Sequence, residues 1–244
     1  MLRTRRLRVV DVATGRALLE GVDFDLVAGR VTVLLGASGS GKTLLARSLA
    51  GLLPAGLRAG GRIYYRGREM DGGAWEGVRG REVFYSPQNA AASLNPVLTV
   101  GVQVGEESGL RPGEIEALLG RLQLADPARA RRSYPHELSG GECQRCLLAL
   151  ALARGAGVLL LDEPFSEIDA GAHDDLADAL RAEQRRGGLT VLLVSHHLGF
   201  VGRVADRLCV LARGRVAASG DPADVLASGR HPYVREIARY LEER

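Results

Sequence analysis

The chain lacks long apolar runs, and this excludes a membrane-spanning helix. Its longest unbroken apolar stretches, such as residues 147–153 and 158–161, fall far short of the roughly 18 residues that such a helix requires. Residues 1–10 carry arginines but no apolar core of the length found in signal peptides. These absences predict a soluble protein of the cytosol.

Cysteine and concentrated positive charge are also scarce. Three cysteines in 244 residues are an odd number in a fairly long chain, which disfavours a disulfide framework. Cys143 and Cys146 form a C-x-x-C pair, but no second pair follows at zinc spacing, so we expect reduced packing thiols. The net charge is +3 with scattered arginines, so nothing indicates a face for nucleic acid. A composition of 46% apolar and 25% charged residues is that of a globular protein.

Lysine is the scarcest cation, because only one of the 32 Lys and Arg residues is a lysine. That residue, Lys42, lies in the run 36–43, Gly-Ala-Ser-Gly-Ser-Gly-Lys-Thr, which matches G-x-x-x-x-G-K-[ST]. The β-branched and leucine run at 31–35 predicts a buried parallel strand before it, and residues 44–53 predict a helix after it. A phosphate-binding loop has this context. The alternative is a Gly/Ser turn before a helix.

The loop predicts a site for ATP and Mg²⁺. Small residues let backbone N–H groups surround a phosphate, and the helix N-terminus adds partial positive charge. Lys42 is expected to bind the β- and γ-phosphates, where a planar guanidinium would fit poorly. The Thr43 hydroxyl is expected to ligate Mg²⁺. The remaining predicted phosphate-binding residues are Gly36, Ser38, Gly39, Ser40 and Gly41.

Two carboxylates end the apolar run at 158–161. Asp162 is expected to bind Mg²⁺ directly or through water, and Glu163 to polarise the water that attacks the phosphate. The alternative is a solvated acidic turn after a strand. The phosphate loop earlier in the chain favours the Walker B interpretation.

Strand-like runs alternate with helical segments along most of the chain, which is typical of a mostly parallel sheet. We therefore predict an α/β fold with a P-loop NTPase (RecA-like) core, an N-terminal antiparallel β subdomain over 2–26 and an inserted α-helical subdomain over 89–154. Residues 56–80 suggest a loop with an edge strand around 63–65. The other expected elements are strands at 158–161, 190–194 and 207–211 and helices at 114–124, 141–154 and 170–186.

A Leu-Ser-Gly-Gly-Glu run at 138–142 lies 23 residues before Asp162 and is followed by a predicted helix. Ser139, Gly140 and Gly141 would offer N–H groups and a helix dipole to an anion. At this spacing, between a P-loop and Walker B acids, the run resembles the LSGGQ signature of the ATP-binding cassette (ABC) ATPases. The resemblance covers roughly residues 2–240 and implies one ATPase domain over 1–244. In that family the anion is the γ-phosphate bound by the opposite subunit.

The resemblance assigns roles to further residues. Gln88 matches the Q-loop glutamine that senses Mg²⁺ and joins the core to the helical subdomain. His196 matches the switch histidine that contacts the γ-phosphate, whereas His197 is expected to be structural. Residues 166–169 occupy the D-loop.

Three positions depart from the family pattern. The signature ends in Glu142 where Gln is usual, which either weakens a composite site or leaves the carboxylate pointing outward. The D-loop has Glu167 and Ile168 where Ala and Leu are frequent. No aromatic residue occurs at 9–14, where the family stacks a ring on adenine, so either base stacking is weaker or Phe24 or another group substitutes.

Two short runs resemble the dipeptide, oligopeptide and nickel import branch of the family. They are Ser-Leu-Asn-Pro at 93–96 and His-Pro-Tyr at 231–233. Leu-Pro-Ala-Gly at 53–56 resembles the nickel-type members, and the chain ends 11 residues after Tyr233, which favours an importer of nickel or a metal chelate. The branch implies a peripheral location on the cytoplasmic face of the membrane.

The implied partners are transmembrane permease subunits, a second ABC ATPase subunit and, indirectly, an extracytoplasmic solute-binding protein. A heterodimer is favoured over a homodimer, and no nucleic acid is expected. Residues 89–108 are expected to form the contact with the transmembrane subunits. Three alternatives remain open. They are a degenerate cassette that binds ATP as a regulatory partner, a cassette that acts off the membrane, and a small-molecule P-loop kinase.

Overall fold

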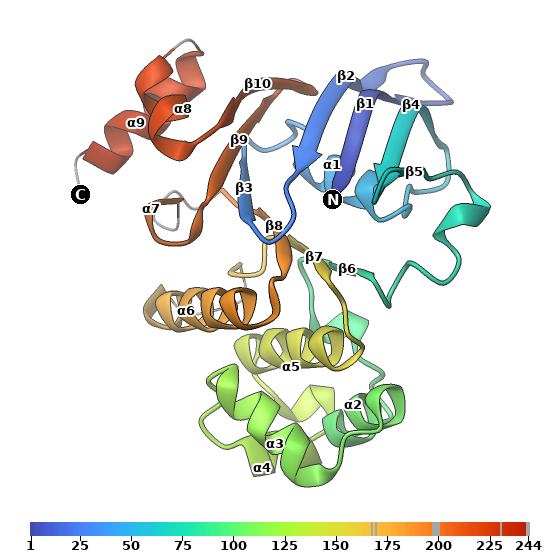
Figure 1. Ribbon diagram of the computed structural model, residues 1–244, viewed down its shortest axis with the longest axis vertical. Coiled ribbons are helices and arrows are strands. Elements are labelled where there is room, and N and C mark those ends of the chain that lie inside the picture. Colours follow the sequence, from blue (N-terminus) through green and yellow to red (C-terminus); the bar gives the residue numbers. More distant parts are fainter. Residues whose placement is uncertain (167, 169, 197–200, 230, 243–244) are drawn as a thin grey trace.

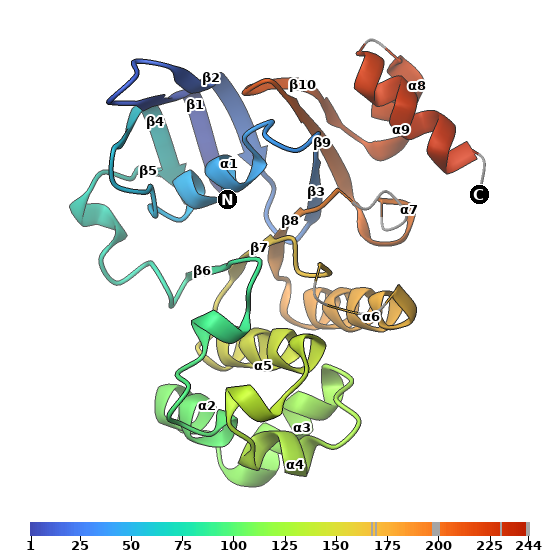
Figure 2. The ribbon, with the colours of Figure 1, turned by 180° about the vertical axis from the view of Figure 1, so that it is seen from behind.

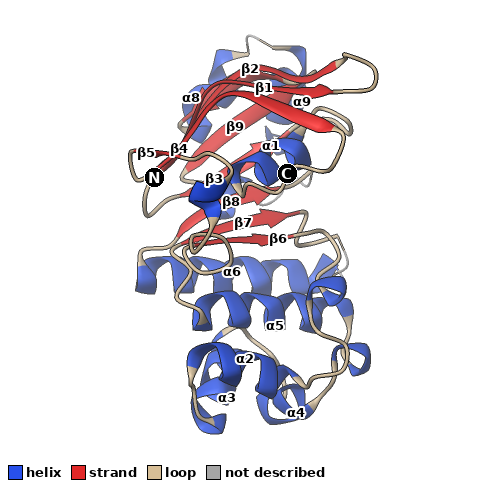
Figure 3. Cartoon of the chain, turned by 90° about the vertical axis from the view of Figure 1, so that its right-hand side faces the viewer, coloured by secondary structure: helices blue, strands red, loops and turns tan. Residues whose placement is uncertain are grey.

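Two β-sheets and a group of helices make up the protein (Figure 1). The structure is a computed structural model, and it describes residues 1–166, 168, 170–196, 201–229 and 231–242. Seen from the side, the antiparallel sheet lies above the mostly parallel sheet, and the helices between residues 100 and 187 lie below it (Figure 3). No helix among these described residues is long and apolar enough to cross a bilayer.

The antiparallel sheet has the strand order β2-β1-β4-β5. Its strands are β1 (Leu2–Asp11), β2 (Ala17–Leu26), β4 (Leu57–Tyr65) and β5 (Arg68–Glu69). Buried residues of β1 such as Leu2, Leu7 and Val9 are separated by exposed arginines, as one buried face requires. The predicted antiparallel strands in 2–26 are confirmed.

The predicted edge strand at 63–65 is wrong in length and in place. β4 begins at Leu57, pairs along β1 from Asp11 to Leu2, and lies between β1 and β5. Glycines hide this strand in the sequence because they interrupt its apolar pattern. Gly61 is required there, since an added Cβ would collide with the backbone carbonyl of Arg6 across a register shift.

The second sheet has the order β10-β9-β3-β8-β7-β6. All neighbouring strands in it run parallel except β10, which is antiparallel to β9. The predicted mostly parallel α/β core is thus confirmed. Its strands are β3 (Val31–Leu35), β6 (Val83–Ser86), β7 (Val158–Asp162), β8 (Thr190–Val194), β9 (Arg207–Ala212) and β10 (Arg215–Gly220).

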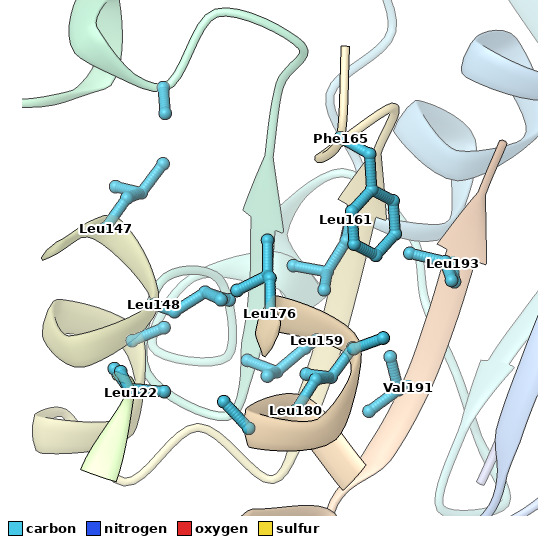
Figure 4. Close-up of a cluster of buried hydrophobic side chains, with 14 of the residues drawn as sticks. Leu122, Leu147, Leu148, Leu159, Leu161, Phe165, Leu176, Leu180, Val191 and Leu193 are labelled. Carbon is cyan, nitrogen blue, oxygen red and sulfur yellow. The ribbon is translucent and has the colours of Figure 1, made fainter. Parts of the chain in front are cut away.

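Both faces of this sheet are covered, which explains the unbroken apolar runs of its strands. Successive residues of β7 enter opposite cores, so that Leu159 and Leu161 join one core while Leu160 joins the other. Figure 4 shows the first core, in which α5 and α6 pack on β7 and β8. On the other face, α1 (Lys42–Leu49) contacts β7 and β8 and also β1 of the antiparallel sheet (Figure 2).

Helices α2 to α5 pack against one another below the sheet. The predicted helix 44–53 is α1, which begins and ends earlier than expected. It ends earlier because Gly51, just after it, adopts a left-handed conformation. Division of the chain at 89 and 154 stays a prediction. The remaining helices are α2 (Val100–Ser108), α3 (Pro112–Arg121), α4 (Pro127–Arg132), α5 (Gly140–Ala153), α6 (Ala170–Gly187), α7 (Val201–Val204), α8 (Pro222–Ser228) and α9 (Pro232–Glu242), with 3₁₀ turns η1 (Gly73–Trp75), η2 (Ala91–Ser93) and η3 (Pro135–Glu137).

Asp206 connects α6 to the first residue of β3 through hydrogen bonds. It accepts two hydrogen bonds from the Arg181 guanidinium, at 2.6 and 2.7 Å, and one from the Val31 N–H at 2.8 Å. The hydrogen bonds from Arg181 are the main cause that lowers the pKa of Asp206. We expect Asp206→Asn to reduce the free energy of unfolding at pH 7 by about 2 kcal/mol, since charge-assisted bonds at a mostly buried site are lost.

This difference should depend on pH. A carboxylate with a lowered folded-state pKa stabilises the protein above its unfolded value of about 4, and the contribution is lost as the pH falls through the folded-state pKa. Urea unfolding of wild type and variant at pH 7, 5 and 3.5 measures it, with Asp25→Asn, at the exposed pair with Arg3, as the control. A pH-independent difference would contradict the assignment.

Candidate functional site

The loop from Gly36 to Gly41 joins β3 to α1 at the carboxyl end of the parallel sheet, where open α/β sheets bind ligands. Its close packing demands glycine. An added Cβ at Gly36 would collide with the Leu211 carbonyl, and one at Gly41, whose φ is 104°, would collide with the Leu19 side chain. The backbone of the neighbouring turn fixes the loop, since the Gly214 N–H donates to the Ser40 carbonyl at 3.0 Å.

Lys42 is the first residue of α1 and is only 8% exposed. Its Nζ donates to the carbonyls of Gly36 at 2.8 Å and Ala37 at 3.3 Å. Burial lowers the pKa of this ammonium, and the nearby carboxylates of Glu163 and Asp162 act in the opposite direction. The only lysine of the chain is therefore folded over the loop that it is predicted to serve.

Asp162 lies at the end of β7 with 3% of its surface exposed. Its Oδ1 accepts a hydrogen bond from the Thr43 hydroxyl at 3.1 Å, and its Oδ2 accepts one from the Tyr85 hydroxyl at 2.8 Å. Burial raises the pKa of Asp162 despite these two donors. The structure thus brings together Thr43 and Asp162, two of the three residues predicted to contact Mg²⁺ with Gln88, and adds Tyr85, which the sequence did not indicate.

Thr43 and Asp162 fit Mg²⁺ only as part of a nucleotide site. Among the residues that the structure describes, no cluster of three or more His, Cys, Asp or Glu side chains could hold a metal alone. Mg²⁺ often takes one or two protein ligands and completes its octahedron with phosphates and water, which matches this hydroxyl and carboxylate.

Cys143 and Cys146 are buried, and burial raises the pKa of the Cys146 thiol.

Glu163 follows directly and has a left-handed backbone, with φ at 52°. Its N–H donates to the Val194 carbonyl of β8 at 3.0 Å, which turns the side chain away from the path of β7. The Oε2 atom of Glu163 lies 2.9 Å from Nδ1 of His196, just beyond the end of β8. Because β7 and β8 are neighbours, the fold pairs two groups that are 33 residues apart.

Lys42, Glu163 and His196 line one cleft with a volume of about 1110 Å³, whereas the mostly buried Asp162 is not among its lining residues. That is ample for a nucleotide, since ligand pockets commonly span about 300–1,000 Å³. Gln88 lies on its wall together with the phosphate loop, Glu163 and His196. The predicted residues that line the cleft are Gly36, Ser38, Gly39, Ser40, Gly41, Lys42, Thr43, Gln88, Glu163 and His196.

The expected aromatic substitute Phe24 is wrong. Phe24 is 3% exposed in the core under the antiparallel sheet, and it does not line the cleft. Arg16 and Arg213 line the cleft instead, as does Tyr233 of the His-Pro-Tyr run. A guanidinium offers a planar face to a ring, so sequence reasoning that looked only for aromatic side chains missed both arginines.

Ser139, Gly140 and Gly141 are not in the lining of this cleft, because they form the N-terminal end of α5. Ser139 caps that helix, and its hydroxyl accepts from the Glu142 N–H at 3.2 Å. Glu142 completes the capping box by accepting from the Ser139 N–H at 2.9 Å, and Arg129 donates to it at 2.7 Å.

The Glu142 carboxylate is therefore directed at its own helix end and at a cation. Burial alone would raise its pKa, but the Ser139 N–H and the Arg129 guanidinium outweigh burial and lower it. These contacts argue against a weakened composite site, because Arg129 already pairs with the Glu142 carboxylate. Glu167, Asp169 and His197 lie outside the described residues, so those predictions stay predictions.

A protein-family model described as "ABC transporter" matches residues 19–166, more than half of the chain. The chain belongs to the ABC transporter family. It is an ATPase domain of that family, and the predicted family is confirmed.

Curated relatives of this cassette are named for transport. A dipeptide transport ATP-binding protein, DppD of Bacillus subtilis, is 32% identical over 90% of this chain and 69% of its own length. A peptidoglycan transport ATP-binding protein, YejF of Agrobacterium fabrum, and an oligopeptide transport ATP-binding protein, OppD of Mycobacterium tuberculosis, are each 34% identical, over 90% and 88% of this chain. The cassette spans only 42% and 37% of those two proteins.

Solved structures share the fold. The dimeric bacterial ABC transporter cassette MJ0796 superimposes with a TM-score of 0.77 at 22% identity, over 91% of this chain and 98% of that one. An ATP-bound bacterial exporter of the Atm1 family gives a TM-score of 0.78 at 25% identity, over 98% of this chain and 41% of that one. The ABC cassette fold, with its antiparallel and parallel sheets, is thereby confirmed.

Proposed function

We propose that the cassette is the ATP-hydrolysing subunit of a membrane importer for short peptides, nickel or metal chelates. The observation that carries hydrolysis is the contact of Glu163 with His196, 2.9 Å apart on the wall of the phosphate cleft. A cassette that only holds ATP has no need of a carboxylate fixed there. This geometry favours hydrolysis over the degenerate, regulatory alternative.

The roles follow from the positions. Backbone N–H groups of the loop and the Lys42 ammonium would bind the phosphates, while Thr43 and Asp162 would hold Mg²⁺, directly or through water. When bound, Mg²⁺ neutralises charge that develops on the phosphate oxygens. Glu163 takes a proton from the attacking water, and His196 holds Glu163 in place. Gln88, on the cleft wall, would contact Mg²⁺, and Arg16 and Arg213 would offer planar faces to the base.

The signature of each cassette serves a second subunit. Ser139, Gly140 and Gly141 lie outside their own phosphate cleft, at a helix N-terminus that is suited to an anion. In the proposed assembly this end faces the γ-phosphate bound by the other cassette, in a heterodimer by preference. Two transmembrane permease subunits dock near Gln88 at the cytoplasmic face of the membrane, and a solute-binding protein delivers the solute outside.

Arg129 has a testable part in this assembly. Removing it by Arg129→Ala leaves the Glu142 charge uncompensated beside the partner's phosphate, so we expect ATP-dependent dimerisation to weaken about three- to tenfold, less so in high salt. Glu142→Gln in the same chain should restore it, because the repelling charge is gone. Analytical ultracentrifugation with Mg-ATP measures the effect. A loss that persists in the double variant would contradict this electrostatic role.

Uptake by cells tests the importer proposal. In native cells whose cassette carries Glu163→Gln, we expect uptake of labelled di- and tripeptides to fall to background, in keeping with relatives named for peptide transport. The Leu-Pro-Ala-Gly run at 53–56 supports nickel as the second candidate, and labelled Ni²⁺ provides the parallel assay. Loss of nickel uptake alone would select nickel. Unchanged uptake of both, with ATP hydrolysis abolished, would contradict the importer proposal.

A further inference from the structure

A second cavity, apart from the nucleotide cleft, lies between the antiparallel sheet and the end of α1. Its volume is about 440 Å³, and ligand pockets commonly span about 300–1,000 Å³. Among the described residues, none lines both cavities. Ser48, near the end of α1, lines the second cavity, whereas Lys42, at the start of the same helix, lines the cleft. A molecule in the second cavity would therefore contact the helix that follows the phosphate loop.

The floor of the second cavity is apolar. Leu7, Met70 and Trp75 form it, and all three side chains are buried. Packing fixes the place of the Trp75 ring, because an added Cβ at Gly51 would collide with three atoms of the indole. The sheet, the end of α1 and the η1 turn thus supply a preformed apolar wall, which suits the apolar side chains of a small ligand.

Charged side chains of both signs lie at the rim of this cavity. Arg62 and Glu69 lie 3.7 Å apart and neutralise each other. Asp71 accepts a hydrogen bond from the Ala74 N–H through Oδ1 at 3.1 Å, and its other oxygen has no partner among the described residues. The exposed Arg79 guanidinium likewise forms no hydrogen bond or ion pair within the described part of the chain. The rim therefore keeps one carboxylate oxygen and one cation free for a ligand.

We propose that this cavity binds an apolar amino acid or short peptide in its zwitterionic form. The ligand ammonium pairs with Asp71, its carboxylate pairs with the Arg79 guanidinium, and its side chains lie on the apolar floor beside Trp75. A ligand with one charge of each sign matches a rim whose two free groups have opposite signs, whereas an anion would meet the Asp71 charge and a cation would meet Arg79. The inference goes beyond the proposed function and does not depend on ATP hydrolysis.

Tryptophan fluorescence measures binding directly, because Trp75 is the only tryptophan of the chain and lines this cavity. Dileucine, which has no aromatic ring, is titrated into the full chain while indole emission is recorded. We expect a saturable change in emission with a Kd of roughly 0.1–1 mM, as ligands of this size commonly reach. Leucine is titrated in parallel, and the tighter binder of the two gives the preferred ligand length.

Capped ligands and matched variants test each charge contact. Arg79→Gln and the use of dileucine amide, which lacks the carboxylate, are each expected to weaken binding about three- to fivefold. Their combination should weaken it no further, because both changes remove the same contact. Asp71→Asn and N-acetyl-dileucine should behave alike, and the exchange keeps an oxygen that can accept from the Ala74 N–H. Arg68→Gln and Glu76→Gln, at exposed positions outside the cavity, are the controls and should match wild type.

Three results would overturn the proposal. The first is no change in Trp75 emission, and no heat of binding in calorimetry, up to about 10 mM dileucine or leucine. The second is equal affinity for dileucine and its doubly capped form, which marks a merely apolar surface. The third is an equal loss of affinity for dileucine and dileucine amide in Arg79→Gln. If dileucine binds as expected but ATP is neither bound nor hydrolysed, the proposed function fails and this inference stands, so the two failures are distinguishable.

Discussion

Glu163→Gln is expected to lower the rate of ATP hydrolysis by about 10²–10⁴-fold while ATP stays bound, because the amide cannot take a proton from water. The amide retains the size of the carboxylate and a hydrogen-bonding atom for His196, which lies 2.9 Å from Oε2. Phosphate release and retention of labelled ATP, measured on the same preparation, check the two halves of this result. Glu20→Gln, at an exposed ion pair with Arg215, is the control.

The same variant reports on the assembly. Trapped ATP should hold two cassettes together, so the mass of Glu163→Gln in solution is expected to double on addition of Mg-ATP if both half-sites work in a homodimer. ATP bound to a persistent monomer would indicate that a different partner cassette is needed, which is what the prediction of a heterodimer states. Hydrolysis within threefold of wild type would contradict the role of Glu163 as the base.

The sequence reveals the parts of the site that are local. The P-loop, the acids after β7 and the cap of α5 are each contained in fewer than ten consecutive residues, and their neighbouring apolar runs identify the strands. Interactions between distant segments are different. The Tyr85–Asp162 and Glu163–His196 contacts depend on strand order, since β6, β7 and β8 are adjacent in the sheet. Neither contact was predicted from the sequence, although the residue pattern and the family resemblance placed Glu163 and His196 separately in the site.

Other misses have local causes. Gly60 and Gly61 interrupt the apolar pattern of β4 and so hide the strand in the sequence. Gly61 is required because β1 approaches it too closely for a Cβ. Arg129 is one of 31 arginines, and nothing in its neighbourhood distinguishes it from the others. Its pairing with Glu142 depends on how α4 and α5 are placed relative to each other, which the sequence pattern does not specify. A scarce residue type carries far more information than a common one.

Lysine is that scarce residue, and Lys42→Arg is expected to weaken ATP binding by more than tenfold, close to the effect of Lys42→Met. The replacement keeps the charge, so a site that needed only positive charge would tolerate it. Lys42 is 8% exposed, and its Nζ already fits between the carbonyls of Gly36 and Ala37 at 2.8 and 3.3 Å. A guanidinium is broader and planar, and it would have to displace a loop that leaves no room for a Cβ beside Leu211 and Leu19.

Calorimetry with ATP in EDTA and in Mg²⁺ measures this loss, and Arg186→Lys at the exposed end of α6 serves as the control exchange. Affinity of Lys42→Arg within threefold of wild type would show that charge alone is needed at this position. The composition of the chain argues otherwise. With arginine at 31 of 32 cationic positions, the retention of one lysine where a compact ammonium contacts two loop carbonyls is explained by geometry, because an arginine would supply the same charge.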